Sequence, residues 1–236
     1  MRPPRRKEQM YMPADTIRIT PIPLGFVNAF LIRGKQAVLI DTGNPGSADR
    51  ILHALGEQGL APHDLALILL THGHGDHVGS SPVLREKTGA KVAIHIRDAD
   101  ALRTGRGPNL TGTNALGRVF AVLLPRPIRG FEPFEPDILI EGELSLQPYG
   151  IAGKVVPTPG HTAGSISVVL ENGAVFAGDT IMGGMGRKGK PRFPLFAEDA
   201  ARAKESIAYL LGQAPESVYT GHGGPFSPAE LRAVFP

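Results

Sequence analysis

The chain has 236 residues, enough for one domain with a sizeable core, and its hydrophobic content of 42% is ordinary for a globular protein. It contains no cysteine, which excludes disulfides, cysteine-ligated zinc and iron–sulfur clusters and leaves nitrogen and oxygen as metal ligands. The formal net charge of +3 equals that of residues 1–10 alone, so residues 11–236 are neutral, which excludes a polyanion-binding body and argues against a nucleic-acid partner.

The basic residues at the start of the chain indicate a disordered tail over residues 1–12, followed by a single domain over residues 13–236. No apolar run approaches the roughly 18 residues that cross a bilayer, and none follows the basic tail as it would in a secretory signal. We therefore expect no membrane partner. Together with the absence of cysteine, this favours a cytoplasmic location.

The first part of the domain predicts strands that alternate with helices. Two apolar runs around a glycine-containing turn at 34–36 predict a hairpin. Apolar residues at helical spacing, with Ser47 as N-cap and Gly59 at the end, predict the first helix. The runs DLALILL and AKVAIHI are typical of buried strands, with a helix between them. The predicted strands are 26–32, 37–40, 64–70 and 90–96, and the predicted helices are 47–59 and 81–89.

The stretch LLTHGHGDHVGS follows the third of these strands and holds four potential metal ligands: His72, His74, Asp76 and His77. In an extended loop, alternate side chains point the same way, so the first two imidazoles can face one point. A turn at the next glycine would aim the aspartate and the last histidine at a second, nearby point. The stretch therefore predicts two adjacent metal sites, and its glycines allow the backbone to approach the ions.

Residues 97–136 form an arginine- and proline-rich insertion without a strand pattern. Long insertions in compact domains are usually functional or disordered. Its apolar segment from Leu116 to Leu124 has helical length and is a candidate lid, pocket wall or dimer contact. Oligomeric state is not readable from the pattern.

The second part of the domain returns to short strands over 137–160 and to a hairpin over 165–180 that turns at Asn172-Gly173. Ala203, Ile207 and Leu210 have the spacing of a helix core within 198–212, and a final strand and loop follow at 217–225. This mixture of hairpins and alternating helices favours an α/β fold with mixed sheets over a purely parallel sheet.

Three further potential ligands follow predicted strands and are flanked by glycine: His161 in TPGHTAGS, Asp179 in VFAGDTI and His222 in YTGHGGP. Loops at strand ends can converge on one edge of a sheet, so we expect these side chains near the first cluster. The remaining histidines lack such a setting and are interpreted as ordinary surface or helix residues: His53, His63 and His95.

Taken together, the His-x-His-x-Asp-His run, PGHTAGS, GDT and the final GH resemble the metallo-β-lactamase superfamily, over about residues 22–227. The resemblance implies an α/β fold, a four-layer αββα sandwich of two mixed sheets, with a dinuclear metal site at one edge. It also implies that Asp41, in LIDTG, orients the ligand loop. The ligands that it implies are His72, His74 and His161 for the first metal, Asp76, His77 and His222 for the second, and Asp179 as the bridge.

Such a site implies a hydrolase in which a metal-bridging hydroxide attacks a small ester-like substrate, a thioester, lactone or phosphoester. The ions would be two divalent metals, zinc in the first place, with iron or manganese as alternatives. Asp76 is the candidate catalytic proton shuttle. The alternative hypothesis is an iron-binding redox, oxygenase-type or sensor protein of the same fold; a binding module with one structural metal fits seven ligands poorly.

The substrate is less constrained by the sequence. The stretch GDTIMGGMGRKGK resembles the corresponding loop of glyoxalase II-like enzymes, but the chain ends fourteen residues after His222, without their additional C-terminal helical region. This departure argues against a glutathione thioester without excluding other thioesters, and lactonase relatives share the full ligand set. The basic residues of this loop suggest recognition of a carboxylate or phosphate on the substrate, with a merely solvated loop as the alternative. They are Arg187, Lys188, Lys190 and Arg192.

Overall fold

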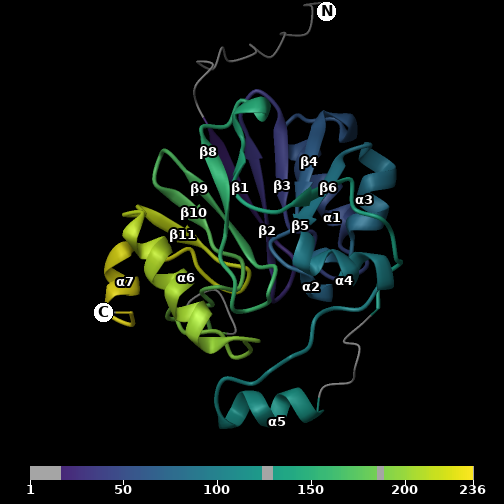
Figure 1. Cartoon of the computed structure of the whole chain (residues 1–236). Coiled ribbons are helices and arrows are strands. Elements are labelled where there is room, and N and C mark those ends of the chain that lie inside the picture. Colours follow the sequence, from purple (N-terminus) through teal and green to yellow (C-terminus); the bar gives the residue numbers. More distant parts are fainter. Residues whose placement is uncertain (1–16, 124–129, 185–188, 236) are drawn as a thin grey trace, which may run out of the picture.

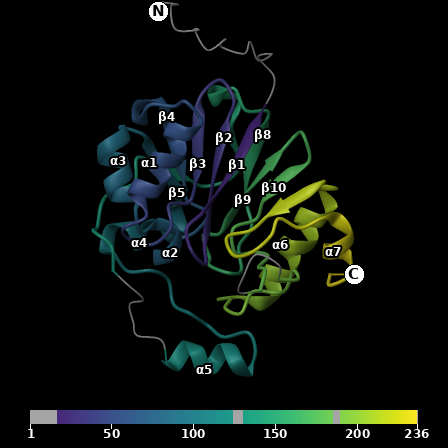
Figure 2. The same ribbon diagram turned by 180° about the vertical axis from the view of Figure 1, so that it is seen from behind.

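The computed structural model describes residues 17–123, 130–184 and 189–235, which form two β-sheets packed face to face (Figures 1 and 2). The first sheet has the order β1-β2-β3-β4-β5-β6, antiparallel from β1 to β3 and parallel from β3 to β6. Its strands are β1 (Arg18–Pro23), β2 (Asn28–Arg33), β3 (Ala37–Ile40), β4 (Leu65–Leu69), β5 (Lys91–His95) and β6 (Ile138–Ile140).

The second sheet has the order β11-β10-β9-β8-β7 and is antiparallel except for the parallel pair β10 and β11. Both sheets are therefore mixed. The strands of the second sheet are β7 (Leu144–Ser145), β8 (Gly153–Pro157), β9 (Ile166–Leu170), β10 (Ala174–Phe176) and β11 (Ser217–Tyr219).

Helices cover the outer face of each sheet (Figure 1). On the first sheet, α1, α3 and α4 contribute Ile51, Leu84 and Leu102 to one core. On the second sheet, α6 and α7 contribute Ile207 and Leu231 to another. The helices of the chain are α1 (Ala48–Glu57), α2 (Gly75–Val78), α3 (Ser81–Thr88), α4 (Ala99–Thr104), α5 (Ala115–Leu123), α6 (Ala200–Gly212) and α7 (Pro228–Arg232).

A third core lies between the two sheets, and the two-residue period of the strands separates it from the outer cores. In β2, Phe30 and Ile32 face the second sheet while Leu31 packs with the helices. From the second sheet, Val168 and Phe176 enter the same inner core. The arrangement is the predicted four-layer αββα sandwich, so the predicted fold class is confirmed.

Some elements differ from the sequence predictions. β1 was not predicted. It contains Pro21 and Pro23, which the structure accommodates at the edge of the sheet, where a missing N–H is tolerated. His95 is neither on the surface nor in a helix: it is buried at the end of β5 and its Nδ1 accepts a hydrogen bond from the Arg97 amide. Burial also lowers the pKa of His95.

The predicted tail, Leu124 at the end of the apolar segment, and two of the four basic residues assigned to the substrate loop, Arg187 and Lys188, lie outside the described residues. The division into a tail and a single domain remains a prediction. Among the residues that are described, no helix is both long and apolar enough to cross a membrane.

Candidate metal centre

All seven predicted ligands lie at one edge of the sandwich, because each follows the end of a strand. The run from His72 to His77 leaves β4 and enters α2, while the others follow β8, β10 and β11. Their side chains form three groups in which the potential ligand atoms all lie within 4.8 Å of one another. These groups are His72–His74–His161, His72–His77–Asp179 and Asp76–His77–His222.

The first half of the cluster consists of three buried imidazoles, which we call the three-histidine half: His72, His74 and His161. Nε2 of His161 lies 3.2 Å from Nε2 of His72 and 3.0 Å from Nδ1 of His74. Burial, and then the positive charge that neighbouring imidazoles would carry, lowers the pKa of His72 well below its usual value and that of His74 to about 3. All three rings are therefore neutral and able to donate a lone pair at neutral pH.

The second half, which we call the carboxylate half, contains Asp76, His77 and His222. Nε2 of His222 lies 3.3 Å from Oδ2 of Asp76, and Nε2 of His77 lies 3.9 Å from the same oxygen. Burial alone would lower the pKa of His222, but Asp179 and Asp76 raise it to about 10. Carboxylates raise the pKa of His77 well above its usual value in the same way.

Asp179 lies between the two halves. Its carboxylate oxygens are 3.5 Å from Nε2 of His77, 3.8 Å from Nε2 of His161 and 3.3 Å from Nε2 of His222. Burial would raise the pKa of Asp179, but His222 and His77 hold it well below its usual value. Its Oδ1 and the facing Nε2 of His77 are buried without a hydrogen-bond partner, which is the arrangement expected of two ligands of one cation.

Hydrogen bonds on the outer ring nitrogens fix the direction of three imidazoles. Nδ1 of His161 donates to the Phe196 carbonyl and Nδ1 of His222 to the Phe26 carbonyl, each at 2.8 Å. Nδ1 of His77 donates to Asp41. Each of these bonds keeps Nδ1 as the donor to its outer partner, so Nε2 faces the cluster and is the atom that can bind a cation once it carries no proton.

Asp41 supports the carboxylate half. Its Oδ2 accepts hydrogen bonds from Nδ1 of His77 and from the Thr71 hydroxyl, and its Oδ1 accepts one from the Thr71 amide, all at 2.8 Å. Since the hydroxyl of Thr71 donates to Asp41, its oxygen accepts from Nδ1 of His72 at 3.0 Å. Asp41 has a φ of 58°, a left-handed conformation that side chains rarely adopt, and this is consistent with a functional constraint.

Asp98 supports the three-histidine half, and the sequence analysis missed it. Its buried carboxylate accepts hydrogen bonds from the amide of Gly73 at 2.8 Å, the hydroxyl of Thr162 at 2.7 Å and the amide of Gly164 at 2.9 Å. One side chain thus ties the loop of His72 and His74 to the loop of His161. A Cβ at position 164 would overlap the Asp98 carboxylate, so glycine is required there. The only sequence signal was an acidic residue just after a predicted strand.

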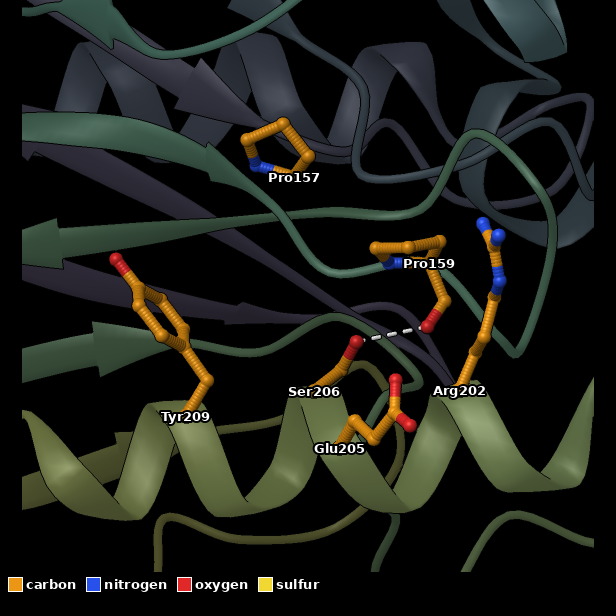
Figure 3. Close-up of a pocket in the computed structure, with 6 residues that line it drawn as sticks. All are labelled: Pro157, Pro159, Arg202, Glu205, Ser206 and Tyr209. Carbon is orange, nitrogen blue, oxygen red and sulfur yellow. Dashed lines mark hydrogen bonds between the residues drawn. The ribbon is translucent and has the colours of Figure 1, made fainter.

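Helix α6 supports the loop of His161 from the other side. Figure 3 shows a shallow hollow between this helix and the loop after β8, in which the Ser206 hydroxyl donates to the Pro159 carbonyl at 2.7 Å. None of the seven predicted ligands lines this hollow. Its lining residues are Pro157, Pro159, Arg202, Glu205, Ser206 and Tyr209.

Phe26 is a second residue that the sequence analysis did not single out. It is exposed and its ring stacks on the imidazole of His222, with centroids 5.7 Å apart and an interplanar angle of 6°. An exposed aromatic ring beside a metal ligand places an apolar surface at the mouth of the site. Of the predicted basic loop, Lys190 and Arg192 are exposed, and the backbone of Arg192 pairs with Met182, three residues after Asp179.

Comparison with known proteins agrees with the geometry. The model of the metallo-beta-lactamase superfamily matches residues 22–222. A probable metallo-hydrolase of Methanocaldococcus jannaschii is 33% identical over 200 residues, which cover 83% of this chain and 87% of that protein. The hydroxyacylglutathione hydrolase GloC of Haemophilus influenzae is 31% identical and covers 75% of this chain and 77% of its own.

Among solved structures, the fold is similar to that of metallo-beta-lactamases. The BLEG-1 B3 metallo-beta-lactamase superposes with a TM-score of 0.68 at 25% identity, covering 94% of this chain and 98% of the other. The region that the family model matches, residues 22–222, includes every predicted ligand and both supporting aspartates.

Proposed function

Since the chain belongs to the metallo-β-lactamase superfamily, a family of metal-dependent hydrolases, we propose that it is a dinuclear enzyme that cleaves a small ester-like bond. The observation that carries the proposal is the position of Asp179, whose carboxylate lies within 3.8 Å of ligand nitrogens from both halves of the cluster. A carboxylate that lies between two ligand sets can serve one ion with each of its two oxygens.

The donor set fits divalent metals. Five imidazoles and two carboxylates suit zinc, iron and manganese, and we propose zinc as the resident ion. His72, His74 and His161 would hold one ion, the carboxylate half would hold the other, and Asp179 would contact both. When bound, such ions polarise the attacked oxygen and lower the pKa of water from about 16 to about 7.

The chain's own residues would then orient the reaction. Asp41 and Asp98 hold the two ligand loops in place through the hydrogen bonds described above. The side chain of Asp76 is 25% exposed, more than those of Asp179 or His222, so its Oδ oxygens can pass a proton to solvent. Phe26 would contact an apolar part of the substrate, and the exposed Lys190 and Arg192 an anionic part.

We propose a thioester, a lactone or a phosphoester as the substrate class. The relative named hydroxyacylglutathione hydrolase supports the thioester, and the neutral body of the chain argues for a small molecule over a nucleic acid.

The test is metal analysis followed by a hydrolase panel. Purified protein is loaded with zinc, iron or manganese, its metal content is measured, and each form is assayed on thioesters, lactones, phosphodiesters and a β-lactam, with and without chelator. We expect close to two equivalents per chain and an activity that chelation abolishes. Metal well below one equivalent after loading, or an activity that a chelator leaves intact, would refute the proposal. A coloured preparation with tightly bound iron and no hydrolysis would favour the redox alternative.

A further inference from the structure

Helix α5 exposes an unusual amount of apolar surface. Val122 is 84% exposed and Leu123 is 71% exposed, and Leu116, Val119 and Phe120 are exposed as well. Only Gly117 and Ala121 of the helix are buried. Contiguous apolar surface of this kind usually marks an interaction site.

The stretch of chain that contains this helix carries formal charge of one sign. Residues 101–131 contain five arginines and no aspartate or glutamate. Arg103 pairs with Glu135 and Asp100, but Arg106 and Arg118 are exposed and make no ion pair with any described residue. We call residues 105–123 the α5 arm; it combines an apolar helix with unpaired positive charge.

The α5 arm stands away from the sheets, at the end of the molecule that also carries α2 (Figures 1 and 2). It is attached to the segment before α6: the amide of Thr113 donates to the Leu195 carbonyl at 3.0 Å, and the amide of Ala197 donates to the Thr111 carbonyl at 2.9 Å. The Phe196 carbonyl between these contacts accepts the hydrogen bond from His161. The arm therefore lies on the metal-centre side of the fold and leaves its apolar side chains open.

We propose that the α5 arm is a docking surface for an anionic lipid bilayer. A short helix with exposed leucine, valine and phenylalanine can place these side chains at the boundary between headgroups and acyl chains, where burial of apolar surface stabilises the bound state. Arg106 and Arg118 complement the negative surface of the membrane, and residues 101–131 contain no acidic side chain. Binding at the membrane surface needs no transmembrane helix. It does depart from the expectation, drawn from the sequence, that the protein has no membrane partner.

A second copy of the chain fits this surface less well. The nine-residue helix is about 14 Å long and about 10 Å across. The area of one face of this helix is therefore far smaller than the roughly 800 Å² per partner that a stable interface buries. A symmetric dimer through the helix would also bring the arginines of both arms together, where like charges repel. Binding to a lipid surface requires only a small apolar contact area on the protein, and the anionic headgroups attract the arginines.

Docking through the arm would turn the metal centre toward the bilayer. If the proposed hydrolase function holds, the substrates presented to it there would be amphipathic esters. That extension depends on the proposed function, whereas lipid binding itself does not require hydrolysis.

The experiment is co-sedimentation of the full, zinc-loaded chain with phosphatidylcholine vesicles, either pure or containing about a third phosphatidylglycerol. We expect binding to the anionic vesicles alone, weakened by salt. Val122→Ser with Leu123→Ser, and separately Arg106→Gln with Arg118→Gln, should each weaken binding by about tenfold or more. These side chains are exposed, so the variants should keep the wild-type circular dichroism spectrum and metal content.

Matched controls separate the arm from the rest of the chain. Arg5→Gln with Arg6→Gln removes the same charge from the N-terminal residues, and Val83→Ser with Val234→Ser removes apolar surface from α3 and the C-terminal end. Both pairs should bind like wild type. Binding that survives the two arm variants, or that falls only with Arg5 and Arg6, overturns the proposal. So does a dimer, seen by analytical ultracentrifugation, that Val122→Ser with Leu123→Ser abolishes. Vesicle binding without hydrolysis on the panel would leave docking intact and remove only the proposed function.

Discussion

The two halves of the metal centre use the same imidazole side chain in opposite electrostatic states. In the three-histidine half, burial lowers the pKa of each ring, and neighbouring imidazoles lower those of His72 and His74 further. In the carboxylate half, Asp179 and Asp76 raise the pKa of His222 to about 10, against the effect of burial. The sequence does not distinguish these histidines; their neighbours in space do.

This difference indicates how each half would accept a cation. The neutral rings of the three-histidine half are ready to bind at neutral pH. In the carboxylate half the buried carboxylates are balanced by imidazolium protons, which an incoming cation must displace. The supporting aspartates follow the same division: Asp41 contacts His77, and Asp98 ties together the loops of the three-histidine half.

Asp179→Asn should weaken metal binding in both halves and should have the largest effect on metal content and activity. The amide keeps the shape of the carboxylate but lacks the negative charge that both halves share. We therefore expect fewer than about one metal equivalent per chain and a loss of activity above about a hundredfold, which is more than substitution of a supporting residue should cause. Metal analysis after dialysis and the hydrolase assay measure this. Asp49→Asn, at an exposed carboxylate, is the control. Two retained equivalents would contradict a bridging role.

Asp98→Asn should damage one half and spare the other. An amide nitrogen cannot accept from the amide donors of Gly73 and Gly164, so at least one of the three hydrogen bonds is lost. We expect about 10- to 100-fold weaker metal binding in the three-histidine half alone. Cobalt titration followed by absorption spectroscopy resolves the two halves.

Asp41→Asn should weaken metal binding mainly in the carboxylate half in the same titration, because Asp41 accepts directly from His77 and reaches His72 only through Thr71. Asp100→Asn, on the exposed side of α4, serves as the control for both variants and should leave the cobalt spectrum unchanged. If each variant weakened metal binding equally in both halves, Asp98 and Asp41 would not support different halves of the site.

The number of protons released on zinc binding should differ between the histidines of the two halves. Because the pKa of His222 is about 10 and that of His77 is also raised, both rings are protonated at pH 7 in the metal-free protein. Zinc binding should release about one to two protons per chain, seen as a dependence of the calorimetric enthalpy on the buffer. His222→Ala should release fewer protons, whereas His161→Ala should release as many as wild type. The same proton release from both variants would mean that the halves do not differ.

The smallest effect concerns a carboxylate outside the site. Arg85, through its hydrogen bonds, lowers the pKa of Asp137 to about 2. Since this pKa is lower in the folded than in the unfolded chain, the pair stabilises the fold above about pH 4, and the contribution is lost as the pH falls toward 2. Arg85 is partly exposed, so Asp137→Asn should cost about 1 kcal/mol in urea unfolding at pH 7, without changing metal content. An equal loss at pH 2 would contradict this origin.

The local patterns of the sequence were sufficient for most of the fold. Apolar runs predicted β2 to β5, the glycine turns predicted two hairpins, and helical spacing predicted α1 and α6. A helix was also predicted at α3, and the apolar segment over α5 was noted for its helical length. The strand-end positions of the histidines and aspartates also predicted the convergence of the seven side chains, because loops at one edge of packed sheets must meet.

The tertiary structure alone decided which residues support the site and which surface remains open. Asp98 bonds to groups 25 and 66 residues away, so no local pattern could identify it. The apolar segment over α5 was a candidate lid, pocket wall or dimer contact in sequence, and its side chains are exposed because no other described element covers them. Side-chain type and spacing depend on neighbours along the chain, whereas ring protonation, support and exposure depend on neighbours in space, which only packing of the two sheets brings together.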